Sequence, residues 1–119
     1  MLKKIIYAHR KRMFAMVVLS LSSGCSQHFE YMDQGQLAYQ QENYDAAVSY
    51  FSKAVTDAPA GQEMTDGLRS LSKAYQAAGK GEEAAATLAR AMKVMRYCLE
   101  NKVASTMVRS NCPIPPWEK

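Results

Sequence analysis

Apolar positions recur at helical spacing in two stretches of the chain, and the second stretch repeats the first. In each stretch a small residue, a large apolar residue and another small residue stand at i, i+4 and i+7, which is one stripe of an α-helix. The two sets, 37 residues apart, are Ala47, Phe51 and Ala54, and then Ala84, Leu88 and Ala91. A constant offset across two helices predicts two equivalent helical hairpins.

Helix-breaking residues separate the predicted helices. Asn43 interrupts the first pair, Gly79 with Gly81 interrupts the second pair, and Pro59 ends the second helix of the first pair. These four positions divide the chain into short helices that succeed one another with brief connections. The pattern therefore indicates an all-α protein.

The apolar stripe of the last helix continues past the point where its counterpart ends. Its members are Leu88, Ala91, Met92, Met95, Leu99, Val103 and Met107. We expect a helix from Glu82 to about Val108, unless it breaks near Asn101, with Met92 and Met95 in the core. Two repeats alone bury their faces poorly, so this long helix is expected to cap the open end of the array.

The end of the chain is rich in proline. Pro113, Pro115 and Pro116 are expected to forbid helix there, and Trp117 to fold back onto the long helix. We therefore divide the mature chain into a helical domain over 29–110 and a Pro-rich tail over 111–119.

The first 24 residues have the order of a bacterial secretory signal peptide. A basic segment, MLKKIIYAHRKR, is followed by the apolar run MFAMVVLSL and the small residues Ser22, Ser23 and Gly24. A stable bilayer span needs ~20 apolar residues, and this run is shorter. We expect residues 1–24 to be removed; an uncleaved anchor helix is the alternative.

The charge of the chain changes once this segment is set aside. The whole chain of 119 residues has a formal charge of +4, but residues 1–24 hold five Lys and Arg and no acid. The remainder has ten basic and eleven acidic residues, which gives −1. A domain with that charge has no electrostatic reason to bind nucleic acid, so no nucleic-acid partner is expected.

The stretch from Leu19 to Cys25 resembles the lipobox of bacterial lipoproteins. Ser23 and Gly24 match the small residues before the cysteine, whereas Ser22 stands where the pattern prefers Leu. The resemblance implies that the chain is cut before Cys25 and that its thiol carries acyl chains, which would anchor the protein permanently.

Two consequences of this resemblance concern location. Residues 25–28 become a lipidated tether, and Ser26, rather than Asp, implies sorting to the outer membrane of a Gram-negative bacterium. Cleavage by an ordinary signal peptidase after Gly24 is the alternative, and it would leave a soluble periplasmic protein.

Lipidation of Cys25 leaves Cys98 and Cys112 as a candidate disulfide pair in the oxidising periplasm. Such a loop is worth ~3 kcal/mol in the chain-entropy model. Two free thiols are the alternative. The sequence has no CxxC motif, and His28 is the single histidine after residue 24, so neither a redox dithiol nor a metal site is expected.

The repeated stretch resembles the tetratricopeptide repeat, a 34-residue helix–turn–helix. The unit GQLAYQQENYDAAVSYFSKAVTDAP supplies the small, aromatic and proline positions of the family, although Ala38 replaces the usual Tyr. The second unit, LRSLSKAYQAAGKGEEAAATLARAM, keeps Tyr75 and the small–large–small stripe, but Gly81 replaces an aromatic and three extra residues within 60–67 lengthen the connection. The resemblance covers about residues 29–93 and implies two tetratricopeptide-like hairpins with a long C-terminal capping helix; a generic helical bundle is the alternative.

The same resemblance implies a partner groove, because the first helices of tetratricopeptide repeats line a concave surface that holds a peptide or helix. Its residues here are Phe29, Met32, Gln36, Tyr39, Gln40, Arg69, Lys73, Gln76 and Ala77. Amides, one Tyr and two cations suit an extended chain and its carboxylates. The alternative is that these positions are simply solvated.

The sequence offers no set of residues for catalysis. No nucleophile–base–acid set or Gly-rich phosphate loop is present, and His28 falls in the expected tether. We therefore expect no enzyme, cofactor or metal. The expected function is that of an outer-membrane lipoprotein that acts as an adaptor between proteins in the assembly of an envelope machine (a pilus, a secretion system or a cell-wall complex). A soluble periplasmic helical-repeat chaperone is the alternative, and the oligomeric state is left open.

Overall fold

The computed structural model describes residues 27–101 and 112–119. Within these ranges the regular structure is entirely helical, which confirms the all-α class. The elements are α2 (Gln27–Gln40), α3 (Tyr44–Thr56), α4 (Gly61–Ala77), α5 (Gly81–Glu100) and the 3-10 turn η2 (Pro116–Glu118). The expected signal peptide and Cys25, the expected site of acylation, lie outside the described residues.

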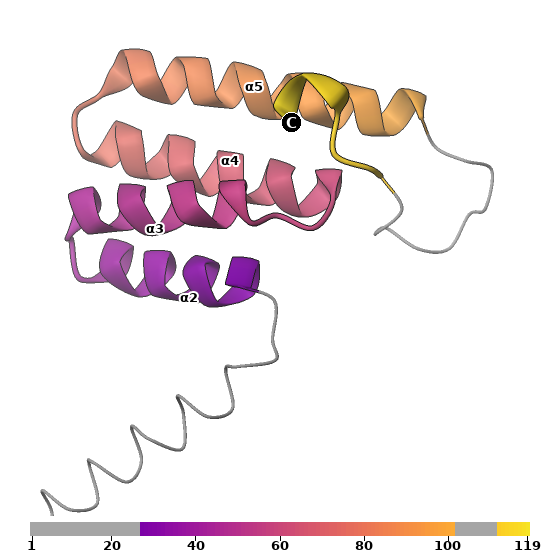
Figure 1. Cartoon of the computed structure of the whole chain (residues 1–119). Coiled ribbons are helices and arrows are strands. Elements are labelled where there is room, and N and C mark those ends of the chain that lie inside the picture. Colours follow the sequence, from indigo (N-terminus) through magenta and orange to yellow (C-terminus); the bar gives the residue numbers. More distant parts are fainter. Residues whose placement is uncertain (1–26, 102–111) are drawn as a thin grey trace, which may run out of the picture.

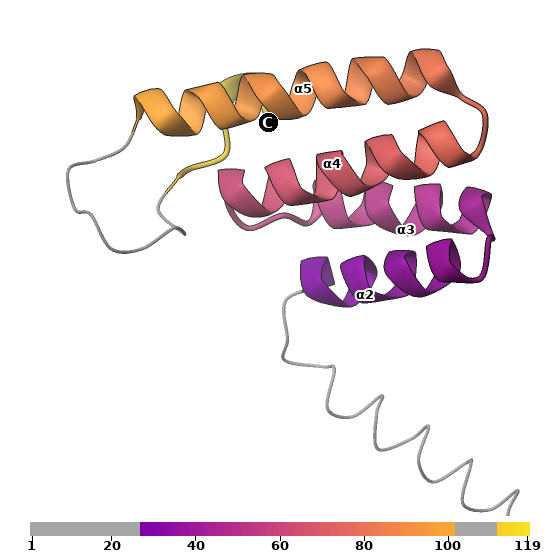
Figure 2. The same cartoon turned by 180° about the vertical axis from the view of Figure 1, so that it is seen from behind.

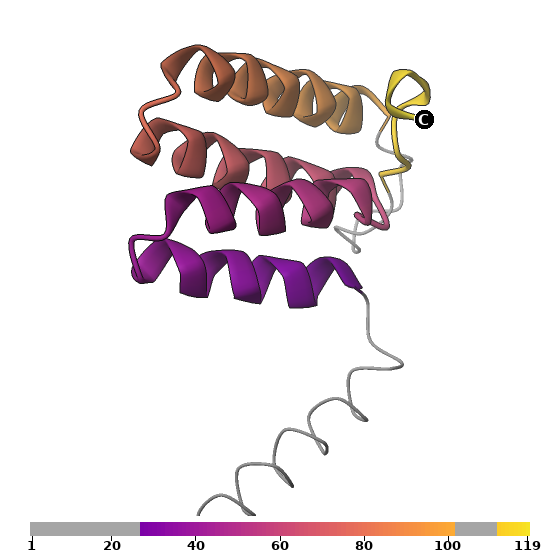
Figure 3. The ribbon, with the colours of Figure 1, turned by 60° about the vertical axis from the view of Figure 1, so that its left-hand side comes forward.

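Each helix packs against the next helix in the chain, and α2 also touches α4. Figure 1 shows α2, α3, α4 and α5 stacked in chain order, with the α2–α3 and α4–α5 turns at one end and the α3–α4 connection at the other. The views from behind and from the side show the same order (Figures 2 and 3). The helices therefore form two successive antiparallel hairpins.

The two hairpins match residue for residue at their turns. Helices α2 and α4 end 37 residues apart, and helices α3 and α5 begin 37 residues apart. In each turn a residue with positive φ follows the first helix: Glu42 at 60° and Gly79 at 78°. The N–H of the residue that follows it donates a hydrogen bond to the carbonyl five residues earlier, which closes a Schellman motif. These bonds, each 2.9 Å, run from Asn43 to Ala38 and from Lys80 to Tyr75.

The small–large–small stripe of α3 lies in the core as predicted. Ala47 and Ala54 are fully buried, and Phe51 is 2% exposed. A Cβ placed on Gly35 of α2 would lie 2.6 Å from the Phe51 ring, so the glycine allows α2 and α3 to approach closely. On the other side of α3, Val55 packs against Gly67 of α4, where an added Cβ would lie 3.0 Å from it.

The corresponding stripe of α5 is only partly buried. Ala84, Ala91 and Val94 face the core, and the Ser72 hydroxyl of α4 donates a 2.8 Å hydrogen bond to the Ala84 carbonyl. Leu88, however, is exposed where its counterpart Phe51 is buried. The small residues meet α4, but no described helix covers the other side of α5 as α4 covers α3.

The expected core positions of Met92 and Met95 are wrong for the same reason, because both are exposed, as is Leu99 of the same stripe. The apolar face of α5 is wider than the stripe that contacts α4. Periodicity identified the whole face, but it carried no information on which half would meet a neighbouring helix.

The extra residues expected to lengthen the connection between the repeats fall within or beside a helix rather than in a long loop. Helix α4 begins at Gly61, so only residues 57–60 connect α3 to α4. Gly61, Met64 and Thr65 are buried in these first turns. Burial of this stripe favours helix over an extended connection.

Helix α5 begins at Gly81, one residue before the expected Glu82, and ends at Glu100. Asn101 caps it, because its side-chain amide donates a 2.9 Å hydrogen bond to the Tyr97 carbonyl. The expected continuation to Val108 lies outside the described residues.

The expected tether over residues 25–28 is wrong at its C-terminal end. His28 lies within α2, is 2% exposed, and its Nδ1–H donates a 2.8 Å hydrogen bond to the Ala54 carbonyl of α3. The imidazole is amphipathic, so it fills a gap between the two helices while bonding a backbone carbonyl. His28 is therefore part of the core.

Candidate partner-binding surface

The residues expected to contact a partner lie on two touching helices. Phe29, Met32, Gln36, Tyr39 and Gln40 belong to α2, and Arg69, Lys73, Gln76 and Ala77 belong to α4. We call these nine residues the α2–α4 surface. All are exposed or half-buried. With the offset of 37 residues, the α2 set except Phe29 matches the α4 set position for position, so the two sets occupy equivalent places on two helices that contact each other.

The aromatic members of this surface are held in place by their neighbours. Tyr39 is half-buried, and its ring packs edge-on against Tyr44 with a centroid distance of 5.3 Å. Phe29 is exposed, with its ring 5.0 Å from that of His28. The Phe29 ring therefore contacts the buried imidazole at the start of α2 while more than half of the residue stays exposed.

Sequence reasoning missed two residues of the same stripe on α4. Gln62 and Asp66 precede Arg69 and Lys73 at the same alternating spacing of four and three residues, so they share one helix face. The Gln62 amide donates a 3.3 Å hydrogen bond to the Asp66 carboxylate. The spacing itself was the signal that would have identified them.

The two cations of this surface are available to a ligand. Arg69 and Lys73 are exposed, and within residues 27–101 and 112–119 neither forms a salt bridge. Asp66 stands one turn before Arg69 and moderates the local positive charge. The result is a mixed polar stripe with two free donors for carboxylates.

The C-terminal tail, residues 112–119, is fastened to both helices of the second hairpin. Cys98 of α5 and Cys112 form a disulfide, with Cα atoms 5.3 Å apart. The Gly61 N–H at the start of α4 donates a 2.8 Å hydrogen bond to the Cys112 carbonyl. A Cβ on Gly61 would lie 2.6 Å from both sulfur atoms, so only glycine fits beneath the disulfide.

The end of the tail docks along one flank of α5. The Trp117 ring packs edge-on against Tyr97 at 5.1 Å, and the Lys93 ammonium lies 4.7 Å from the Trp117 ring centre. The return of Trp117 onto α5 agrees with the sequence expectation. The expected absence of helix in the tail is wrong, because Pro116 begins the turn η2. A proline fits the first position of a helical turn, where no N–H is needed.

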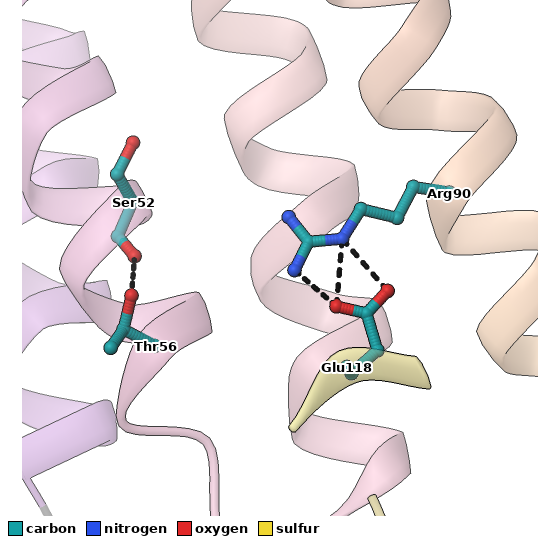
Figure 4. Close-up of polar contacts among 4 residues, drawn as sticks. All are labelled: Ser52, Thr56, Arg90 and Glu118. Atoms are coloured by element: carbon teal, nitrogen blue, oxygen red, sulfur yellow. Dashed lines mark hydrogen bonds and ion pairs between the residues drawn. The ribbon is translucent and has the colours of Figure 1, made fainter. Parts of the chain in front are cut away.

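An ion pair completes this docking (Figure 4). The Arg90 Nε lies 2.9 and 3.0 Å from the two Glu118 carboxylate oxygens, and Nη2 donates to the same group. These hydrogen bonds from Arg90 lower the pKa of Glu118, against the opposing effect of burial. The same contact raises the pKa of Arg90. Figure 4 also shows the Thr56 hydroxyl donating a 3.1 Å bond to the Ser52 carbonyl in the last turn of α3.

The residues that the structure describes hold neither a cluster for a metal ion nor a helix that could cross a membrane. Within 27–101 and 112–119, no group of three or more His, Cys, Asp or Glu side chains is placed to hold a metal ion. Among the described helices, none is both long enough and apolar enough to cross a membrane. No family model, curated protein or solved structure matches this chain.

Proposed function

We propose that this protein is an outer-membrane lipoprotein whose tetratricopeptide-like hairpins bind a protein partner at the α2–α4 surface, as an adaptor in the assembly of an envelope machine. The observation that carries this proposal is the equivalence of α2 and α4. They are contacting helices that carry the same register positions, and two of these positions in α4 hold cations without an ion-pair partner in the described residues.

The helical packing supports the tetratricopeptide part of the proposal. The hairpin turns recur at a fixed offset, Gly35 allows α2 to approach Phe51, and α4 packs onto the previous hairpin through Gly67. Repeats of this kind place equivalent surfaces side by side, which suits the binding of an extended chain. We propose α5 as the last helix of the array, with the docked tail covering one flank of it.

The proposed ligand is a segment of a partner protein with at least one carboxylate. Arg69 forms two parallel bonds with a carboxylate, and Lys73, one turn later, neutralises a second negative group. Gln36, Gln40 and Gln76 offer amides that bond to the backbone of an extended peptide. Phe29 supplies an exposed apolar contact at the end of the surface.

The proposed anchor is the acylated Cys25, which lies two residues before α2 begins. Several acyl chains hold a protein at a membrane without a spanning helix. The helical stack would then stand close to the inner leaflet of the outer membrane, facing the periplasm, with α2 nearest to the anchor in sequence.

Charge reversal tests the binding proposal. The variant Arg69→Glu/Lys73→Glu is expected to lose at least tenfold in partner recovered by affinity capture from envelope extract. Its circular dichroism melt is expected to stay near that of the parent, because exposed charge changes usually alter stability by less than ~0.5 kcal/mol. The matched control Lys53→Glu/Lys80→Glu makes the same change in net charge at two other exposed positions and should retain capture. Full capture by the first variant would exclude these cations as the binding groups.

A further inference from the structure

Helix α5 has an apolar face that no described residue covers. Leu88, Met92, Met95 and Leu99 are 47%, 53%, 44% and 60% exposed. They follow one another at spacings of four, three and four residues, so they form a single stripe. We call these four residues the α5 apolar face. At 100° per residue, the stripe lies about a quarter-turn from the α4 contact and on the flank opposite to the tail.

The equivalent face of α3 shows what this surface lacks. Leu88 and Met92 of α5 correspond to Phe51 and Val55 of α3, which are 2% and 3% exposed. Val55 is covered because it packs against Gly67 of the following helix. The α5 apolar face therefore stands where the stack would receive another helix.

We propose that the helix in this place is α5 of a second copy of the chain, in antiparallel orientation. The spacing of four, three and four is the same in both directions. An antiparallel copy thus sets Leu88 opposite Leu99 of the second copy and Met92 opposite Met95. Each apolar side chain meets an apolar side chain, and the two contacts are related by a two-fold axis, as in most homodimers.

The residues bordering the face favour this orientation over a parallel one. Ala85 and Ala89 are exposed beside it and leave room for close approach, while Arg96 is the charged residue at its edge. A parallel pair would bring the two Arg96 side chains to the same level. The antiparallel pair separates them by five residues, ~7.5 Å along the axis, and opposes the helix dipoles.

The size of the interface sets the expected affinity. One helix pair with four apolar residues from each copy buries less than the ~800 Å² per partner of a standard stable interface. We therefore expect a reversible dimer with a Kd in the micromolar range. The proposal uses no part of the α2–α4 surface and is independent of the function proposed for it.

Co-capture of two tagged copies tests the proposal with the full chain in bacterial cells. One copy carries one epitope tag after Lys119 and the second copy a different tag. The parent chain should co-capture itself, and Met92→Glu/Met95→Glu and Met92→Lys/Met95→Lys should each lose at least tenfold. Because these positions are exposed, both variants should keep the parent melting temperature. Mixing the two variants should restore co-capture.

A third variant separates the two orientations. Met92→Lys/Met95→Glu puts opposite charges together in an antiparallel pair and like charges together in a parallel pair. We expect this variant to self-associate within about twofold of the parent. The antiparallel orientation would be overturned if this variant failed to self-associate while the two uniformly charged variants still associated with each other. Undiminished co-capture by either uniformly charged variant, or no co-capture of the parent, would overturn the second copy as the occupant.

Discussion

Glu42 and Gly79 hold the same place in two successive hairpin turns, and both have a left-handed backbone, with φ of 60° and 78°. The closing hydrogen bonds around them have the same length. Glycine adopts this conformation without steric cost, whereas a side chain clashes with the following carbonyl. The first turn therefore keeps the geometry of the second at an energetic cost.

Replacing Glu42 with glycine should relieve this cost. We expect Glu42→Gly to raise the free energy of unfolding by about 0.5–1 kcal/mol, because the gain in the turn exceeds the greater freedom of glycine in the unfolded chain. The melting temperature of Glu42→Gly should therefore rise by a few degrees, which a thermal melt measures. Two controls should lose stability: Gln41→Gly in the same turn, and Gly79→Ala in the second turn. A lower melting temperature for Glu42→Gly would show that the side chain stabilises the turn.

The docking of the tail should depend on pH through Glu118. Its pKa is lowered from an ordinary value of 4.5 by the hydrogen bonds from Arg90, so the folded state favours the carboxylate. The stabilisation is complete above that ordinary value and is lost as the pH falls through the lower, folded-state pKa. Arg90, whose pKa the same contact raises, is charged over this whole range, as any guanidinium is.

The fluorescence of Trp117, the single tryptophan of the chain, reports this step. In the parent we expect the Trp117 emission to change as the pH falls below about 4.5, while far-ultraviolet circular dichroism still shows helix. In Glu118→Gln the emission should already differ at neutral pH and the acid step should disappear. An unchanged acid step in Glu118→Gln would assign it to another carboxyl group.

Lipid attachment has a direct chemical test at Cys25. In bacterial cells fed labelled palmitate, we expect the parent and the Cys98→Ala/Cys112→Ala variant to incorporate label and to fractionate with the outer membrane. Cys25→Ala should remain an unprocessed, unlabelled precursor. If Cys25→Ala is instead cut and released into the periplasm, an ordinary signal peptidase processes the chain and the soluble alternative is correct.

Much of the helical core follows from periodicity in the sequence. Ala47, Phe51 and Ala54 are buried as their spacing predicts, and the turns fall at Asn43 and Gly79. These features depend on residues close together in the chain, where spacing and steric constraints act locally.

The errors concern features that depend on which surfaces meet. Met92 and Met95 lie on an apolar stripe, but only contact with a further helix would have buried them. His28 was assigned to a tether because its partner, the Ala54 carbonyl, is 26 residues away. Asp66 is missing from the expected surface because it stands one turn before Arg69, outside the groove positions that the resemblance implies.

Site-specific crosslinking most directly tests the central claim, which is that a protein partner binds at the α2–α4 surface. A photo-crosslinking amino acid at position 36 or 76, in the full chain in bacterial cells, replaces a glutamine that lies on the α2–α4 surface. The control positions are Ser49 on α3 and Ala86 on α5, both exposed and outside that surface. We predict that irradiation joins one partner protein to positions 36 and 76 and not to the controls, and that Arg69→Glu/Lys73→Glu reduces the product at least tenfold. Equal crosslinking at Ser49 or Ala86, or a product unaffected by the charge reversal, would contradict the account.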